Sequence, residues 1–427
     1  MLHKYLFDYN KGTECPLRYH QWGYLSILAT TLGRNCWLPF GQRNLYPNQF
    51  IMFIGSPAAR KSAAVEAATR LLRASDYTTI SRGRTSKEKF LLDLSGHVDD
   101  TGTKHNPALN EGAKLAIKNI FDCDINELTG DINDPSETLI AADEFNNYIG
   151  TGNFEFISLL GELWDMPDDY PVRVKNSKSY TINKPCVNIL AGNTPTGFAA
   201  AFPPEILGQG FASRLLLVYG ERTKVRNTLP ERPAQEVTLE LAKHLQEVRL
   251  RMCGEFTIEL TGEVFEVIDW LYKNWVSLDD TRFQNYSGRR FSHLLKLSLL
   301  FAADRLDMRV SVRDVIAANT ILSITEHDMP RALGEFGKSR NSEVTNRLVE
   351  HINNAREPQT VSMLWEHCQV DLDKMSTMID IIQGLVKAKK LQNVKGGFLP
   401  IKKVMKQEIK YFDINLIGGK HYPEITG

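Results

Sequence analysis

The sequence predicts an α/β fold with a P-loop core, and two patterns lead to this prediction. From residue 50 to residue 219, apolar runs typical of buried strands alternate with segments rich in helix-forming residues. The first apolar run, 50–54, is followed by a loop of small residues, a Lys-Ser pair and a helical segment, which is the layout of a P-loop. Beyond residue 236 helical patterns dominate, and residues 342–400 carry the pattern of a winged helix.

The composition is that of a globular protein without an excess of either charge. Of the 427 residues, 42% are hydrophobic and 24% are charged, and 51 Lys and Arg balance 51 Asp and Glu. A nucleic-acid site must therefore be a local patch. The six cysteines form no CxxC pair, and no apolar run is long enough to span a bilayer. We therefore expect reduced thiols, no membrane partner and a cytoplasmic location.

The length exceeds that of one ordinary core, so several domains are expected. Near the N-terminus, a helix at 19–32 ends at Gly33, and a short hairpin follows at 36–47. A Pro- and charge-rich linker covers 226–240. The expected divisions are an N-terminal segment at 1–48, the P-loop core at 49–225, a helical domain at 237–335, the winged helix at 342–400 and a mobile tail at 401–427.

The candidate P-loop connects the strand 50–54 to a helix. In such a loop, backbone N–H groups and the helix N-terminus face phosphate oxygens. Lys61 is expected between the β- and γ-phosphates of ATP, and the Ser62 hydroxyl is expected to bind Mg²⁺. The alternative is an Ala/Ser-rich loop that caps an ordinary helix. The loop consists of Gly55, Ser56, Pro57, Ala58, Ala59, Arg60, Lys61 and Ser62.

The residue before the lysine departs from the P-loop pattern. Arg60 occupies the place of the usual final Gly. Because Arg does not adopt every backbone conformation open to Gly, we expect the loop to form without a strained angle at this position.

A second chemical landmark is the apolar strand at 138–142 that ends in Asp143-Glu144. This is the Walker B pattern. We expect Asp143 to bind Mg²⁺, and Glu144 to orient or deprotonate the water that attacks the γ-phosphate. The alternative is a solvated turn. Before this strand, residues 95–136 are interpreted as a surface insertion with a helix at Glu111–Phe121.

The segment 171–182 predicts a β-hairpin in which apolar and basic residues alternate about an Asn-Ser turn. One interpretation is an exposed ribbon whose lysines keep it soluble. The other is a DNA-binding hairpin that presents Arg173, Lys175 and Lys178 to a phosphate backbone.

Two polar residues lie at the ends of further apolar runs. Asn193 ends the run 186–192, where its side chain could bind the attacking water or the γ-phosphate. Arg214 precedes the last apolar strand, 215–219, where it could reach the nucleotide of a neighbouring subunit and stabilise transition-state charge. The alternative for Arg214 is a surface ion pair of little energetic consequence.

Several motifs between residues 20 and 330 carry a family resemblance. They are the Arg-Lys-Ser end of the P-loop, Asp143-Glu144, Phe156-Ile157-Ser158-Leu159-Leu160, Lys184-Pro185-Cys186-Val187-Asn188-Ile189-Leu190 and Gly210-Phe211-Ala212-Ser213-Arg214. With these motifs the chain resembles a domain family common in phage and prophage replication proteins, often described as replicative or primase-associated helicases. More distantly, their order resembles AAA+ helicases of the superfamily 3 and minichromosome-maintenance type.

The resemblance implies an AAA+-like ATPase core with a helical lid, in a bacterial or phage-infected host cytoplasm. In it, Asn193 matches sensor 1, and the hairpin 171–182 matches a DNA-gripping hairpin. Arg214 matches the arginine finger, and Arg289 or Arg290 matches the sensor 2 position at the nucleotide. The lid comprises predicted helices at 237–251, 262–276 and 291–305, the last of which has leucines that also suit a core face.

The predicted winged helix has three helices, at 342–354, 360–367 and 373–389, and a two-stranded wing at 391–399. Such modules bind DNA through the third helix or the wing. A structural or protein-binding role is the alternative, because the third helix is not strongly basic.

Three functions remain open at this point. The leading one is an ATP- and Mg²⁺-dependent helicase or translocase that forms a hexameric ring on DNA, most simply single-stranded DNA, with a separate primase or polymerase as partner. The second is an ATP-dependent loader or remodeller of a replication protein that unwinds nothing. The third is a nucleotide-binding scaffold, which Glu144 disfavours because a scaffold needs no catalytic carboxylate.

Overall fold

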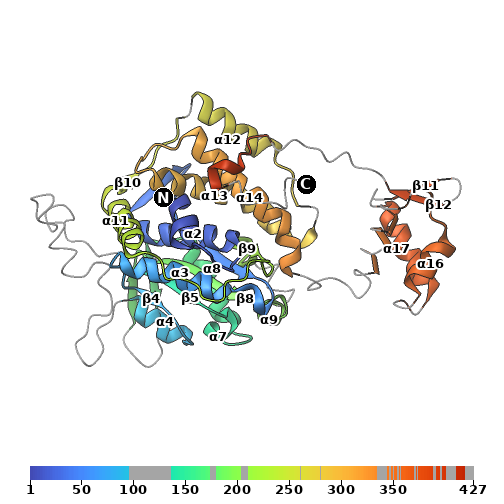
Figure 1. Cartoon of the computed structure of the whole chain (residues 1–427), viewed down its shortest axis with the longest axis horizontal. Helices are drawn as coiled ribbons and strands as arrows, with labels where there is room; N and C mark the ends of the chain where they lie inside the picture. The colour runs from blue at the N-terminus through green and yellow to red at the C-terminus, as the bar shows by residue number, and fades with distance from the viewer. Residues whose placement is uncertain are drawn as a thin grey trace, which may run out of the picture. The chain divides into compact units, whose positions relative to one another are not determined.

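The computed structural model describes most of the chain and divides it into two compact units (Figure 1). The described residues are 1–95, 136–173, 179–202, 210–259, 261–278, 280–333, 410–418 and most of 344–400, where 346–347, 350, 353–354, 356, 370–371, 373, 388–390 and 395–396 are left out. The first unit comprises Met1–Leu333 and Tyr411–Gly427, and the second comprises Gly334–Lys410.

A parallel five-stranded sheet forms the centre of the first unit, so this part of the chain is α/β as predicted. The strand order is β4-β5-β8-β3-β9. Every residue of β3, β5 and β8 is buried, which explains why these strands appear in the sequence as continuous apolar runs. The strands are β3 (Phe50–Ile54), β4 (Ile80–Ser81), β5 (Glu137–Ala142), β8 (Cys186–Asn193) and β9 (Leu215–Tyr219).

The sheet has helices on opposite sides (Figure 1). In that view α12 (Glu263–Asn274), α13 (Gln284–Asp304) and α14 (Val312–Leu333) lie on one side, and α4 (Lys87–Leu94) and α7 (Phe145–Ile149) lie on the other. Ser86 caps α4 by accepting a hydrogen bond from the Lys89 N–H at 3.2 Å. No helix in the described ranges is both long and apolar enough to cross a membrane.

Helix α2 (Leu17–Leu32) is buried on all sides from Tyr19 onward, and it ends at Gly33 as the sequence predicts. Gly33 has φ +57°, and a Cβ at this position would lie 2.0 Å from Glu137 Oε1. Glu137 is itself buried. It accepts a hydrogen bond from the Arg34 N–H at 2.8 Å and pairs with the Arg249 guanidinium at 3.2 Å. This carboxylate therefore joins β5, the end of α2 and α11 (Gln235–Arg251).

The predicted N-terminal hairpin is confirmed as β1 (Cys36–Phe40) and β2 (Arg43–Leu45), which pair antiparallel. The predicted helices at 237–251 and 262–276 correspond to α11 and α12. Helix α13 begins at Gln284, seven residues before the predicted start at 291. These helices belong to the same compact unit as the sheet.

The prediction of a mobile C-terminal tail is wrong for residues 411–417. The Asn319 side chain donates to the Tyr411 carbonyl at 2.9 Å, and the Asp413 N–H donates to the Thr320 hydroxyl at 3.0 Å. The short helix η5 (Ile414–Ile417) buries Ile417 completely. These contacts attach the segment to α14, so its position is fixed by tertiary packing. Residues 401–409 and 419–427 lie outside the described residues.

The second unit contains two helices and a hairpin in its described part. Helix α16 (Val361–Cys368) is capped by Thr360, the first residue of the predicted helix, whose hydroxyl accepts from the Met363 N–H at 3.3 Å. Helix α17 (Met375–Lys387) precedes strands β11 (Leu391–Val394) and β12 (Gly397–Pro400), which pair antiparallel where a wing was predicted. Only a few residues of the predicted first helix are described.

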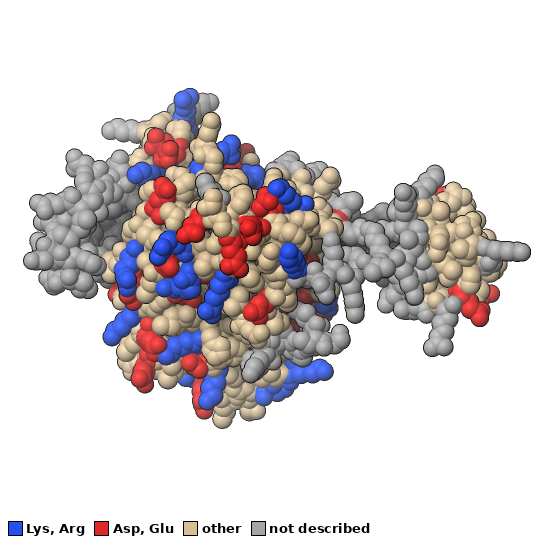
Figure 2. Space-filling view, turned by 90° about the horizontal axis from the view of Figure 1, so that it is seen from above, with Lys and Arg blue, Asp and Glu red and all other residues tan. Residues whose placement is uncertain are grey.

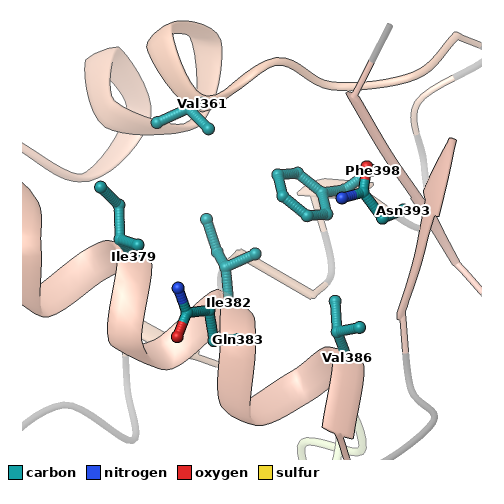
Figure 3. A pocket seen from close by; sticks show the side chains of 7 residues that line it. All are labelled: Val361, Ile379, Ile382, Gln383, Val386, Asn393 and Phe398. Atoms are coloured by element: carbon teal, nitrogen blue, oxygen red, sulfur yellow. The ribbon is translucent and has the colours of Figure 1, made fainter. Parts of the chain in front are cut away.

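The core of this unit includes Met378, Ile382 and Leu385 of α17, and Ile381 packs against it partly buried. Beside this core lies a cavity of about 290 Å³ between the two helices and the hairpin. Figure 3 shows the side chains around this space. They are mostly apolar: Val361, Ile379, Ile382, Gln383, Val386, Asn393 and Phe398.

Candidate functional site

The predicted P-loop connects β3 to α3 (Lys61–Ala74). The Lys61 ammonium group is turned into the loop, where it donates to the carbonyls of Gly55 and Ser56 at 2.8 Å each. Burial lowers the pKa of Lys61, and the carboxylate of Glu144 acts in the opposite direction. The lysine therefore lies within the electrostatic field of Glu144.

Glycine at the first loop position is required by close packing. A Cβ at Gly55 would lie 2.3 Å from the Gly220 carbonyl oxygen and 2.6 Å from the Tyr19 hydroxyl. That hydroxyl lies within hydrogen-bonding distance of the carbonyls of Ile54 and Gly220, at 2.9 and 3.0 Å. Tyr19 of α2 thus holds the ends of β3 and β9 together beneath the loop. The sequence carries no local signal for this role.

Arg60 adopts the left-handed conformation, with φ 59° and ψ 31°. The expectation of a loop without a strained angle at this residue is therefore wrong. The left-handed region costs a non-glycine residue about 1–2 kcal/mol. The Arg60 side chain pairs with Glu14 at 2.8 Å, and Glu14 also accepts from the Asn227 N–H at 3.0 Å. The exposed guanidinium thus attaches the loop to two other segments.

The strain at Arg60 predicts that Arg60→Gly is more stable than Arg60→Ala. Both changes remove the ion pair with Glu14, but only Gly adopts this conformation freely. Gly also gains more conformational freedom in the unfolded state, which offsets part of this advantage. The expected difference in free energy of unfolding between the two variants is therefore about 1 kcal/mol. In a unit of this size that difference corresponds to roughly 1–2 °C in melting temperature. Calorimetry on both variants measures it. A melting temperature of Arg60→Ala equal to or above that of Arg60→Gly would contradict the proposed strain.

The second set of predicted residues lies at the ends of β5 and β8. Asp143 and Glu144 follow β5 directly, and both are exposed. Asn193 ends β8 and pairs in register with Ile54, the last residue of β3. At Gly192 a Cβ would lie 2.5 Å from the Asp143 carbonyl oxygen and 3.3 Å from Lys61 Cβ. The end of β5, the end of β8 and the start of α3 therefore lie close together at one edge of the sheet.

Asn193 is buried, and its side chain is held in one orientation. Its amide donates to Asn146 Oδ1 at 2.8 Å, and its own Oδ1 accepts from the Thr194 N–H at 3.0 Å. Asn146 lies on α7, the helix that begins directly after Glu144. Glu144 in turn accepts from the Asn147 side chain at 2.8 Å. The carboxylate and the amide are therefore fixed by the same short helix.

These residues line one cleft with a volume of about 1040 Å³. The cleft brings together Lys61, Ser62, Asp143, Glu144 and Asn193, five residues that the sequence predicts. It also includes residues that the sequence analysis missed. The lining is Pro57, Lys61, Ser62, Arg82, Gly83, Arg84, Ala141, Ala142, Asp143, Glu144, Asn146, Asn147, Tyr148, Gly150, Thr151, Asn193 and Thr194.

The described residues contain no group of three or more His, Cys, Asp or Glu side chains that could hold a metal ion alone. The cleft does offer the Ser62 hydroxyl and the Asp143 carboxylate, both exposed. Oxygen ligands of this kind suit Mg²⁺, which usually keeps several waters and binds through one or two protein oxygens and substrate phosphates. The donor set therefore fits the predicted ion.

Arg214 and Arg289 lie around Trp164, and neither lines the cleft. Arg214 pairs with Asp165 at 2.5 Å and donates to the Gly210 carbonyl at 2.8 Å. Arg289 lies 3.7 Å from the same carboxylate, and burial, followed by the charge of Arg214, lowers its pKa. Lys296 lies 3.7 Å from the Trp164 ring, and burial lowers its pKa to about 7. Three basic side chains thus surround one indole ring.

Arg290 is buried among the helices. Its guanidinium donates to Glu326 at 2.7 Å and to Asn319 at 2.9 Å, and only 2% of the residue is exposed. The sequence left open which of the two neighbouring arginines faces a nucleotide. Arg289 is the one of the two whose side chain is only partly buried.

The predicted hairpin is present as β6 (Asp169–Val172) and β7 (Tyr180–Asn183), which pair antiparallel. Arg173 follows β6 and is exposed. Lys175 and Lys178 lie outside the described residues. Figure 2 shows acidic and basic side chains interspersed on the visible face, as equal numbers of each predict.

Comparison with known proteins identifies no relative. No protein-family model matches the chain. A search of curated proteins finds no match either.

Proposed function

We propose that the chain is an ATP-hydrolysing oligomeric DNA motor, a helicase or translocase of the phage and prophage replication type. One observation carries the proposal. A single cleft unites Lys61 and Ser62 of the P-loop sequence with Asp143, Glu144 and Asn193 at the ends of neighbouring strands. A phosphate-binding loop, a Mg²⁺ ligand and a catalytic carboxylate are the parts that nucleotide hydrolysis needs.

The strand order supports an AAA+-like core for this site. Strand β8 lies between β3, which leads into the loop, and β5, which leads into Asp143. Asn193 at the end of β8 therefore lies beside both the phosphate-binding loop and the acidic pair. This position supports the match of Asn193 to sensor 1. Helices α11, α12 and α13 correspond to the proposed lid helices, and the second unit corresponds to the proposed winged helix.

The five predicted residues of the cleft each have a role in the proposed reaction. Backbone N–H groups of the loop and Lys61 bind the phosphates, and Lys61 exchanges its two carbonyl contacts for phosphate oxygens. Ser62 and Asp143 hold Mg²⁺, which when bound neutralises charge on the phosphates. Glu144, held by Asn147, orients the attacking water and accepts its proton. Asn193 hydrogen-bonds the same water or the γ-phosphate.

Oligomer and DNA contacts complete the proposal. Arg214 does not line the cleft of its own chain, so it would act on the nucleotide of a neighbouring copy in a ring. The hairpin β6–β7 would carry Arg173, Lys175 and Lys178 to single-stranded DNA. With no net charge, binding depends on such local groups and on their repetition around the ring.

An ATP-dependent loader or remodeller of a replication protein is the second candidate. The apolar cavity of the second unit favours it, because a DNA-binding groove needs basic side chains, whereas this lining has none (Figure 3). In this case the second unit binds a protein, and hydrolysis changes a conformation without strand displacement.

Measuring ATPase activity with and without single-stranded DNA tests the proposal. We expect Mg²⁺-dependent hydrolysis that DNA stimulates, and loss of this stimulation when Lys175 and Lys178 are replaced by Ala. Each lost phosphate contact should flatten the dependence of log affinity on log salt by roughly 0.7. If the wild-type rate of ATP hydrolysis is the same with and without DNA, the loader is favoured. Absence of hydrolysis with and without DNA contradicts both candidates.

A further inference from the structure

The loop between β4 and α4 brings two arginines to the wall of the cleft that Lys61 also lines. Arg82, Gly83 and Arg84 all line the cleft, although none belongs to the P-loop or to the acidic pair. Gly83 has φ +80°, and a Cβ there would meet nothing within 4 Å. Its positive φ turns the chain at this point and leaves open space on the side of the cleft.

Tyr148 of α7 anchors this loop at both ends. The hydroxyls of Ser81 and Tyr148 are hydrogen-bonded at 2.7 Å, and the Thr85 N–H donates to the Tyr148 carbonyl at 3.2 Å. Tyr148 is itself buried. Because α7 begins directly after Glu144, the arginine loop and the candidate catalytic carboxylate are fixed to the same helix.

The two arginines differ in their contacts. Arg82 donates to the Glu66 carboxylate at 2.7 Å, so its charge is already balanced. In the part of the chain that the structure describes, no carboxylate pairs with Arg84, whose side chain is exposed to the cleft. Its guanidinium lies against the backbone of Gly150, 3.8 Å from where a Cβ would be. An unpaired guanidinium that lines a cleft of this kind suits an anion such as a phosphate group.

We propose that Arg84 is a phosphate-binding residue of this cleft and contacts the terminal phosphate of a nucleoside triphosphate. The position of Arg84 in the cleft indicates which phosphate it contacts. Lys61 and the loop hold the phosphate chain from one wall, and the terminal phosphate points toward Glu144, which activates the attacking water. Arg84 is anchored to the helix that follows Glu144, so it faces the same end. This inference rests on the proposed nucleotide site.

Binding measurements separate this role from a general effect on the cleft. The probes are a non-hydrolysable ATP analogue and ADP, each titrated with Mg²⁺ by calorimetry. Arg84→Gln should weaken binding of the analogue by about tenfold or more, the usual effect of losing a charge-assisted hydrogen bond. Its affinity for ADP should stay within about twofold, because ADP lacks the contacted group. Arg84→Lys, which keeps the charge without the planar fork, should be intermediate.

Lys87→Gln is the matched control, because it removes a basic side chain that lies just after the same loop, pairs with Glu155 and does not line the cleft. It should leave both affinities within about twofold. Equal weakening of analogue and ADP by Arg84→Gln, or no change in either, overturns the inference. Unchanged nucleotide affinities with weaker single-stranded DNA binding overturn it in favour of a nucleic-acid contact. If the wild-type protein binds neither nucleotide, or if Lys61→Ala leaves its nucleotide affinity unchanged, the proposed nucleotide site itself fails.

Discussion

Glu144→Gln is expected to bind ATP as tightly as the wild type and to hydrolyse it about 10²–10⁴-fold more slowly. The amide has the size of the carboxylate and can still contact Asn147, but it cannot accept a proton from water. Glu144 is exposed at the end of β5, so the change should leave the fold intact. Single-turnover hydrolysis and equilibrium binding measure the two effects separately. Hydrolysis at the wild-type rate would show that another residue is the base.

Two further variants are controls for this experiment. Lys61→Ala removes the ammonium group that lies in the loop, so it should lose nucleotide binding as well as turnover. Asn147→Ala removes the hydrogen bond that holds Glu144 at 2.8 Å while leaving the carboxylate in place. It should slow hydrolysis less than Glu144→Gln does, because the base remains but is less well oriented.

Features with a local signal could be predicted from the sequence. The buried strands β3, β5 and β8 are continuous apolar runs, and the small-residue loop with Lys61 follows one of them. Gly33 marks the end of α2 because no side chain fits beside Glu137. Asp143, Glu144 and Asn193 were placed at strand ends, and the carboxyl ends of parallel strands meet at one edge of a sheet.

Features that depend on distant contacts could not be predicted. Tyr19 supports the loop from a helix some 35 residues earlier in the chain, and Asn146 orients Asn193 from a helix some 47 residues earlier. Arg84 follows an unremarkable two-residue strand, β4, and reaches the cleft only because Tyr148 anchors its loop. Each of these roles requires two segments that are far apart in the chain and meet only in the folded state.

Two expectations failed because tertiary contacts overrode a local rule. Arg60 adopts a conformation that glycine prefers, and its ion pair with Glu14 helps to hold it there. Residues 411–417 were expected to belong to a mobile tail, but the Asn319 side chain donates a hydrogen bond to Tyr411, the Thr320 hydroxyl accepts one from Asp413, and both contacts fix the segment on α14. A deletion that begins at residue 342 would therefore also remove a packed part of the first unit.

The second large effect is expected at Arg214. Arg214→Ala should bind ATP normally and lose turnover by about 10³-fold or more, as expected for an arginine that stabilises transition-state charge. Because Arg214 does not line the cleft of its own chain, an intact Arg214 in the adjacent subunit should restore turnover. In an equal mixture with Lys61→Ala, roughly one interface in four pairs an intact cleft with an intact arginine in a heterologous ring. Steady-state ATPase of the mixture measures this recovery.

The ion pair with Asp165 provides the control that separates catalysis from structure. If Arg214 serves only to hold Asp165, then Asp165→Ala breaks the same 2.5 Å contact and should lower turnover as much as Arg214→Ala does. If Arg214 acts in a neighbouring cleft, Asp165→Ala should lower turnover far less, because Arg214 remains, held by the Gly210 carbonyl and the face of Trp164. A chain that stays monomeric at full specific activity contradicts the trans role, since no second copy is then present to receive the arginine.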